Sequence, residues 1–127
     1  MIPKFRAWHN ELGRMMSIKN MWFQNSRIEE LELNDAVMND YITAYPDEIE
    51  LMQSTGLFDK NNKEIFEGDI VLVLDSPYTV FYDNEKGSYR LKPHDDRWNV
   101  DYMSNFSHGG NFEVVGNIYE NKELLDA

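Results

Sequence analysis

The stretch LMQSTGLFDKNNKEIFEGDIVLV, residues 51–73, decides the fold of this 127-residue chain. Its polar centre, Asp59 to Lys63, is typical of a hairpin tip, because Asn tolerates the left-handed backbone of a tight turn. The run from Ile70 to Leu74 is the most hydrophobic in the chain, too short for an ordinary helix and rich in β-branched side chains. Gly68 and Asp69 precede it as a bend. A hairpin followed at once by a buried strand indicates a small β-barrel.

The rest of the chain continues this alternation of short strands and turns. The apolar and polar residues alternate, or form short apolar runs, at residues 4–8, 15–18, 28–33, 48–54, 78–82, 89–91 and 112–119. Gly13 and Gly87 suit the turns of two hairpins. Residues 35–43 are interpreted as a short helix or loop, and residues 121–125 as a single helical turn.

We therefore predict a mainly β protein with little helix. Residues 1–48 are expected to form an N-terminal β-hairpin arm followed by an irregular acidic segment. Residues 49–127 are expected to form an SH3-like small β-barrel.

The composition is that of a globular protein without special redox chemistry. Hydrophobic residues make up 42% of the chain and aromatic residues 13%, which is enough for a core. The absence of Cys excludes thiolate metal sites, thiol nucleophiles and disulfides. There is no apolar run of about 18 residues and no secretory signal pattern, so we expect no membrane contact and a cytoplasmic location.

Charge is distributed unevenly along the chain, whose net charge is −11. Residues 1–27 carry five basic residues and one acid, whereas residues 28–59 carry nine acids and no Lys or Arg. Two segments of opposite charge can neutralise each other within one subunit or between two. The interaction residues predicted from this N-terminal segment are its cations and neighbouring aromatic side chains: Lys4, Arg6, Trp8, Arg14, Lys19, Trp22, Phe23 and Arg27.

No pattern in the chain indicates catalysis or a cofactor. His94, Asp95, Asp96, Asp101 and His108 could supply metal ligands, but their spacing matches no metal signature and an ordinary surface loop explains them better. Adjacent carboxylates on a strand point to opposite faces and do not form an acid–base pair. Neither a nucleophile elbow nor a phosphate-binding glycine loop is present. We predict no catalytic residue, no metal site and no cofactor.

Three blocks of sequence carry a resemblance to a known family. They are FRAWHNELGRMM (5–16), LMQSTGLFDKNNKEIFEGDIV (51–71) and FEVVGNIYENKELL (112–125). In this order they resemble the YopX family of bacteriophage and prophage proteins. Asn62 stands where the family pattern has Gly, and Phe66 where it more often has Tyr. The resemblance implies an SH3-like barrel with an N-terminal extension, in a family whose function is not established and which offers no catalytic residues to carry over.

Three functions are compatible with these features. The first is a non-enzymatic protein-interaction module that self-assembles, with the basic arm of one copy docked on the acidic segment of another. Host or phage proteins are further possible partners. The second is a nucleic-acid-associated accessory protein that uses the cations and aromatic rings of the arm. The third is an acidic decoy that mimics a phosphate backbone, which requires the nine carboxylates of residues 28–59 to line one exposed face.

Overall fold

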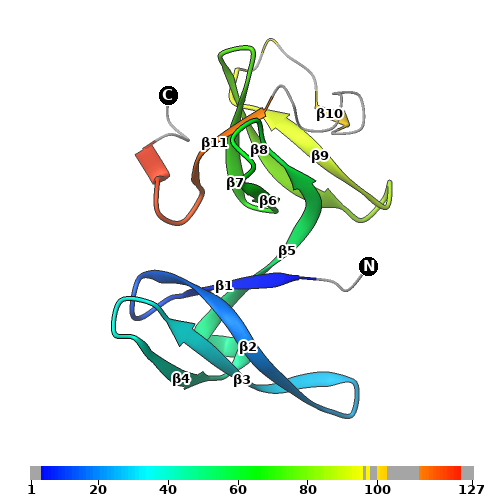
Figure 1. The fold of residues 1–127 in the computed structure, drawn as a ribbon. Coiled ribbons are helices and arrows are strands. Elements are labelled where there is room, and N and C mark those ends of the chain that lie inside the picture. The colour runs from blue at the N-terminus through cyan, green and yellow to red at the C-terminus, as the bar shows by residue number, and fades with distance from the viewer. Residues whose placement is uncertain (1–3, 96, 98–99, 103–111, 124–127) are drawn as a thin grey trace. The chain divides into compact units, whose positions relative to one another are not determined.

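A computed structural model describes residues 4–95, 97, 100–102 and 112–123 (Figure 1). The strands are β1 (Phe5–His9), β2 (Arg14–Gln24), β3 (Arg27–Asp35), β4 (Asp40–Ala44), β5 (Ile49–Phe58), β6 (Glu64–Phe66), β7 (Asp69–Val73), β8 (Ser76–Asp83), β9 (Ser88–Pro93), β10 (Asp101–Tyr102) and β11 (Phe112–Asn117). A short 3-10 helix, η1 (Pro46–Glu48), precedes β5. The expected mainly β architecture is confirmed. Among the described residues, no helix has the length and apolar character needed to cross a membrane.

The chain divides into two compact units, residues 1–53 and residues 54–127. In the N-terminal unit the strand order is β4-β3-β2-β1-β5, and β5 continues into the second unit, where it pairs with β6. In the C-terminal unit the order is β10-β9-β8-β7-β11. Both units therefore share one topology: four strands form an antiparallel meander, and a fifth returns to pair with the first. This is the strand order of an SH3-like barrel, although the hydrogen bonds between the described strands do not close either sheet.

The N-terminal unit differs from the arm and irregular segment expected from the sequence. Strand β1 lies between β2 and β5, paired with both, so the expected hairpin arm is the centre of a sheet. The acidic segment supplies β3 and β4 to the same sheet. Its core consists of apolar side chains from every strand of the unit: Ala7, Met16, Leu31, Leu33, Ala44 and Ile49.

Residues 35–43 also differ from the expected short helix or loop. Asp35 ends β3, a turn follows, and β4 begins at Asp40. The sequence combined helical spacing of Ala36, Val37 and Tyr41 with the β-favouring pair Ile42 and Thr43. The pairing of β4 with β3 favours the extended conformation over the helical one, because Ile42 packs against the core when the segment is a strand.

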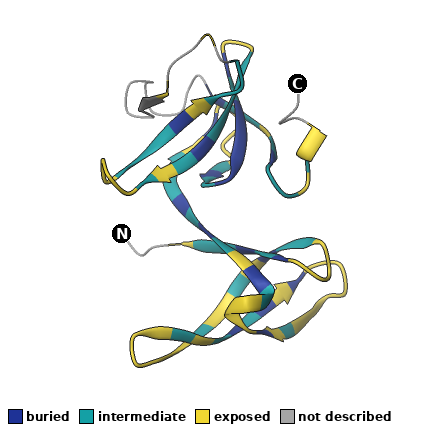
Figure 2. Cartoon of the chain, turned by 180° about the vertical axis from the view of Figure 1, so that it is seen from behind, coloured by how far each residue is buried: buried dark blue, intermediate teal, exposed yellow. Residues whose placement is uncertain are grey.

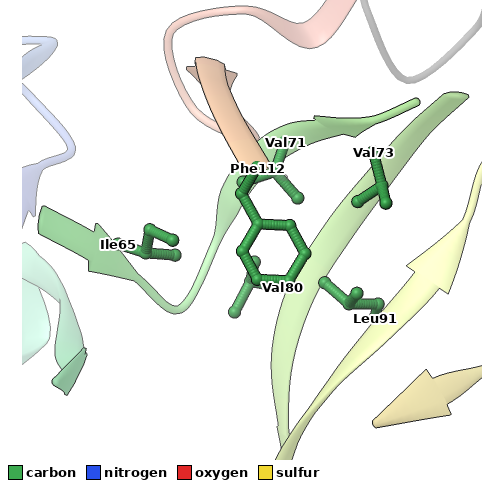
Figure 3. Packing of buried hydrophobic residues seen from close by; sticks show 6 residues of the cluster. All are labelled: Ile65, Val71, Val73, Val80, Leu91 and Phe112. Atoms are coloured by element: carbon green, nitrogen blue, oxygen red, sulfur yellow. The ribbon is translucent and has the colours of Figure 1, made fainter. Parts of the chain in front are cut away.

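The C-terminal unit has its own core, centred on Phe112 (Figure 3). The Phe112 ring is fully buried and is surrounded by aliphatic side chains: Ile65, Val71, Val73, Val80 and Leu91. These come from β6, β7, β8 and β9. Two of them belong to the apolar run that the sequence identified as a central strand, and β7 indeed lies between β8 and β11.

Asp59 joins the hairpin turn after β5 to strand β11. Its side chain is 5% exposed. One carboxylate oxygen accepts hydrogen bonds from the backbone N–H groups of Asn61 (2.9 Å) and Lys63 (2.8 Å), and the other accepts from Val114 (2.9 Å). Asn62 adopts the left-handed conformation that the sequence required of it, with φ of 65°. A single carboxylate thus shapes the turn and holds a strand 55 residues further along the chain.

The two remaining motif loops are likewise fixed by polar side chains. Asp69, which is buried, accepts a hydrogen bond from the Phe66 backbone N–H at 2.8 Å and so closes the bend before β7. At the end of β11, Asn117 accepts hydrogen bonds from two backbone N–H groups that follow it, while its own N–H donates to the Asn121 side chain. Gly116 is required beside this contact, because a Cβ there would lie 2.5 Å from Asn121 Oδ1.

We predict that Asp59→Asn destabilises the protein by about 2 kcal/mol, because the amide cannot accept the three hydrogen bonds that the carboxylate accepts. Burial is the largest single influence and raises the Asp59 pKa, but the backbone hydrogen bonds and the charge of Lys63 together lower it below the ordinary value of 3.8. A lowered pKa stabilises the fold above pH 3.8, and this contribution is lost as the pH falls through the folded-state pKa.

Urea denaturation of the wild type and of Asp59→Asn at several pH values checks this prediction. The difference between their free energies of unfolding should become smaller as the pH is lowered. Asp75→Asn, which removes a carboxylate from an exposed turn, serves as the control and should change stability by less than about 0.5 kcal/mol. Equal effects of the two substitutions at neutral pH would contradict the assigned role of Asp59.

We predict that Gly116→Ala destabilises the protein by about 1–3 kcal/mol, because the new Cβ must displace the Asn121 side chain. In an Asn121→Ala background only the residue 121 Cβ remains, 3.0 Å from the new Cβ, and the same substitution should cost at least about 1 kcal/mol less. A double-mutant cycle by chemical denaturation measures the difference. Equal costs in both backgrounds would mean that the Gly116–Asn121 contact does not set the requirement for glycine.

Candidate interaction surface

The end of the β2–β3 hairpin extends beyond its neighbouring strands (Figure 1). Strand β1 pairs with β2 only as far as Ser17, and β4 pairs with β3 only from Leu31 onward. Residues 22–24 and 27–30, here called the hairpin tip together with the turn between them, thus pair only with each other. Asn25 and Ser26 form that turn with φ of 53° and 65°, the conformation of a two-residue hairpin loop.

Two large aromatic residues of the hairpin tip are exposed, and the ribbon at this end of the β2–β3 hairpin is coloured mainly as exposed in Figure 2. Trp22 is 44% exposed and Phe23 is 62% exposed, whereas Met21 beside them packs against the core. An open depression lies at the turn of the hairpin and is lined by Gln24, Asn25, Arg27, Ile28 and Glu29. A two-stranded ribbon gains little stability by itself. Exposed aromatic rings at its end are therefore better explained by contact with another molecule than by the folding of this chain.

Arg14, one of the predicted interaction residues, is paired within the chain. Its guanidinium lies 2.5 Å from the Asp35 carboxylate, which is 2% exposed. Asp35 also accepts hydrogen bonds from the backbone N–H groups of Val37 and Met38. The pair therefore fixes the start of β2 to the turn between β3 and β4.

Lys19 is also engaged within the chain. Its ammonium lies 3.2 Å from the Glu32 carboxylate and 3.9 Å from the centre of the Tyr41 ring. A bulge in β2 between Ile18 and Asn20 places Lys19 outside the regular register. The ion pairs of Arg14 and Lys19 show that the basic and acidic segments neutralise each other, in part, within one subunit.

The other predicted residues lie at two places. Arg6 and Trp8 share one face of β1 and are half-buried, opposite Met52 and Glu50 of β5; Lys4 is exposed just before the strand. Trp22, Phe23 and Arg27 lie together on the hairpin tip. The structure thus brings three of the eight predicted residues into one exposed group.

The nine carboxylates of residues 28–59 do not form one exposed face. Asp35 and Asp59 are buried in turns, and Glu32 is paired with Lys19. Glu48 accepts a hydrogen bond from the Tyr45 backbone N–H. The others are spread over β3, β4, η1 and β5. This scatter removes the geometric basis for a phosphate-mimicking decoy.

Of the five possible metal ligands in residues 94–108, His94 and Asp95 make other contacts, Asp101 lies in β10, and two lie outside the described part of the chain. His94 Nε2 is 2.7 Å from Thr79 Oγ1. Asp95 is paired with Arg97 at 2.6 Å, and hydrogen bonds from that guanidinium lower the Asp95 pKa to about 2. Asp96 and His108 are not among the described residues. No group of three or more potential ligands that could hold a metal occurs among the residues that are described.

A second group of exposed apolar side chains, which the sequence did not predict, lies in the turn before β4, within β4 and directly after it. It consists of Val37, Met38, Tyr41 and Tyr45, with exposed fractions of 72%, 68%, 51% and 49%. A signal was present in the stretch NDAVMND, residues 34–40, where Asn and Asp flank a short apolar run. Asn and Asp favour turns, so the apolar residues between them would be expected on the surface.

Comparison with known proteins agrees with this fold. A crystal structure of protein EF1440 from Enterococcus faecalis is 28% identical and covers 98% of this chain and 99% of that one, with a TM-score of 0.69. The crystal structure of protein yopX from Bacillus subtilis is 17% identical and covers 95% and 96%, with a TM-score of 0.59. At 17% identity, the similarity to protein yopX concerns the fold alone. No curated protein matches the chain.

The family described as YopX protein matches residues 4–126. That match includes both units and all three sequence blocks. Three polar side chains of those blocks, Asp59, Asp69 and Asn117, hold turns and strand ends together, so the fold explains this part of the family pattern. The chain belongs to the YopX family.

Proposed function

We propose that this protein is a non-enzymatic protein-interaction module that self-assembles. In keeping with the family resemblance, we place it in a phage or prophage genome and in the cytoplasm of the host cell. One observation carries the proposal: large apolar side chains are exposed in two groups on the N-terminal unit, the hairpin tip and the surroundings of β4. Aromatic and Met side chains are enriched at protein interfaces, where they supply contact area.

The polar residues of the chain support the same proposal indirectly. The buried carboxylates and amides serve the fold: Asp35 binds Arg14, and Asp59 and Asn117 cap turns. His9, which is buried, accepts a hydrogen bond from the Leu12 backbone N–H. A side chain that shapes a turn in this way is not positioned to act on a substrate.

Self-assembly is expected to rest on apolar contact. The docking of a basic arm on a neighbour's acidic segment is less favoured than the sequence suggested, because Arg14 and Lys19 already pair with acids of their own chain. Two copies with a net charge of −11 each also repel one another, and salt screens this repulsion.

We predict a molar mass that is a defined multiple of 15.0 kDa, measured by light scattering after size exclusion. The multiple should persist or increase at high salt, because screening weakens the repulsion between acidic subunits and leaves apolar contacts intact. An assembly that dissociates in salt would point instead to charge-driven docking. A monomer at both salt concentrations would contradict self-assembly.

Nucleic-acid binding is the alternative function. Trp22, Phe23 and Arg27 offer rings for stacking and one cation, but Glu29 and Glu30 lie beside them on the same hairpin. Single-strand binding requires a positive groove along the backbone, and the other cations of the N-terminal segment are dispersed or paired.

We therefore expect no binding of a fluorescent single-stranded oligonucleotide at low salt, where electrostatic binding is strongest. Fluorescence anisotropy and quenching of Trp emission measure it. Binding that weakens steeply with salt and is lost in Trp22→Ser/Arg27→Ser would favour the nucleic-acid alternative.

A further inference from the structure

Strand β4 is an open edge of the N-terminal sheet. It pairs with β3 through five consecutive residues, from Asp35–Asp40 to Leu31–Ala44, without a bulge. No other described strand pairs with it. Its second side therefore presents a regular row of backbone N–H and C=O groups, which is a template for another strand.

This edge lacks the features by which natural proteins block such pairing. Edges are commonly protected by Lys, Pro or a bulge. The β4 sequence, DYITA, has neither Lys nor Pro. Its single charge, Asp40, is at the first position, where the carboxylate accepts a hydrogen bond from the Tyr41 N–H at 2.7 Å. Apart from this hydrogen bond, no feature of the β4 sequence opposes pairing.

We propose that β4 pairs antiparallel with β4 of a second copy of this chain, about a two-fold axis at Ile42. This inference rests on the proposed self-assembly and names its surface. The register is self-complementary: Ile42 faces Ile42 of the second copy, Tyr41 faces Thr43, and Asp40 faces Ala44. Of the two side chains that pack in the core, Ile42 lies beside Ile42 of the other copy, and Ala44 lies opposite the exposed Asp40.

Apolar burial favours this register over others. When Asp40 faces Ala44 of the second copy, the turn before β4 lies beside the residue that follows β4 in that copy. This brings Val37 and Met38 of one copy near Tyr45 of the other, on both sides of the axis. These side chains are among the most exposed apolar groups of the N-terminal unit, and the pairing covers them.

The charges near the axis do not oppose the pairing. Lys19 lies over the Tyr41 ring, and Glu32 is the neighbour of Thr43 on β3. Lys19 and Glu32 are already paired with each other within each copy, so the two copies bring neutral pairs toward the axis. No like charges face each other across the axis, so the register costs no repulsion at the contact.

A single engineered cysteine tests the register, because the chain contains no Cys. At the axis the two Cα atoms of residue 42 would lie about 4.5–5.5 Å apart, within the range of a disulfide. Ile42→Cys should therefore form a covalent dimer on mild oxidation, seen on a non-reducing gel. Thr43→Cys is the matched control, because its two Cα atoms would be about 8 Å apart and should not be linked efficiently. Trp22→Cys tests contact through the hairpin tip.

A second variant tests the surface without touching the core. Tyr41→Lys/Thr43→Lys places like charges opposite each other across the axis, and both native side chains are exposed. We expect light scattering to show a halved mass for this variant, with an unchanged circular dichroism spectrum. Leu74→Lys, a charge added on an exposed turn of the C-terminal unit, and Trp22→Ser/Phe23→Ser should leave the mass unchanged.

The outcomes separate this inference from the proposed function. A wild-type multimer that resists the double-Lys substitution, and that forms no disulfide in the Ile42→Cys variant, would overturn β4 pairing while self-assembly stands. A mass halved by the tip variant alone would assign the assembly to the hairpin tip. A monomeric wild type would overturn both. Loss of assembly in the double-Lys variant, together with disulfide formation in Ile42→Cys, would support β4 pairing.

Discussion

A small sheet buries only one face, and this constraint governs both units of the protein. Four strands in a meander leave the first strand with an open edge and the apolar face partly uncovered. The fifth strand resolves both problems, because it pairs with the first and adds core residues of its own. In the N-terminal unit this strand is β5, with Ile49, and in the C-terminal unit it is β11, with Phe112. In each unit the pairing of the fifth strand with the first completes the sheet and its core.

The return of a strand from a distant part of the chain needs a fixed attachment. In the C-terminal unit Asp59 provides it, by accepting hydrogen bonds both from its own turn and from the backbone of β11. The ion pair between Lys60 and Glu113 lies next to it, and the Lys60 N–H donates to the Phe112 carbonyl. In the N-terminal unit the Asn10 N–H donates to the Glu48 carbonyl just before β5. Polar residues that look like candidates for chemistry are thus used to hold strands in place. The proposed function therefore rests on the exposed apolar side chains of the N-terminal unit.

Local patterns predicted much of the strand content because hairpins are local. The turn at Asp59–Lys63, the buried run of β7 and the hairpin around Gly87 are each encoded by neighbouring residues. The N-terminal unit was missed as a separate sheet because its decisive contact joins β1 to β5 across more than 40 residues of sequence. The hairpin at Leu74 and Asp75 was likewise not anticipated, since Leu rarely adopts the left-handed conformation found there.

By itself, the sequence determined the class of the protein: a mainly β chain of the YopX family, strongly acidic, without cysteine and with eight interaction candidates among residues 1–27. These properties depend on composition and on residues close together in the chain. Only the tertiary structure decided which charges are already paired. The ion pair of Arg14 with Asp35 and that of Lys19 with Glu32 form because β2 and β3 are adjacent, and the same pairing leaves β4 as an open edge. Strand neighbours are chosen by burial over the whole sheet, which no local pattern specifies.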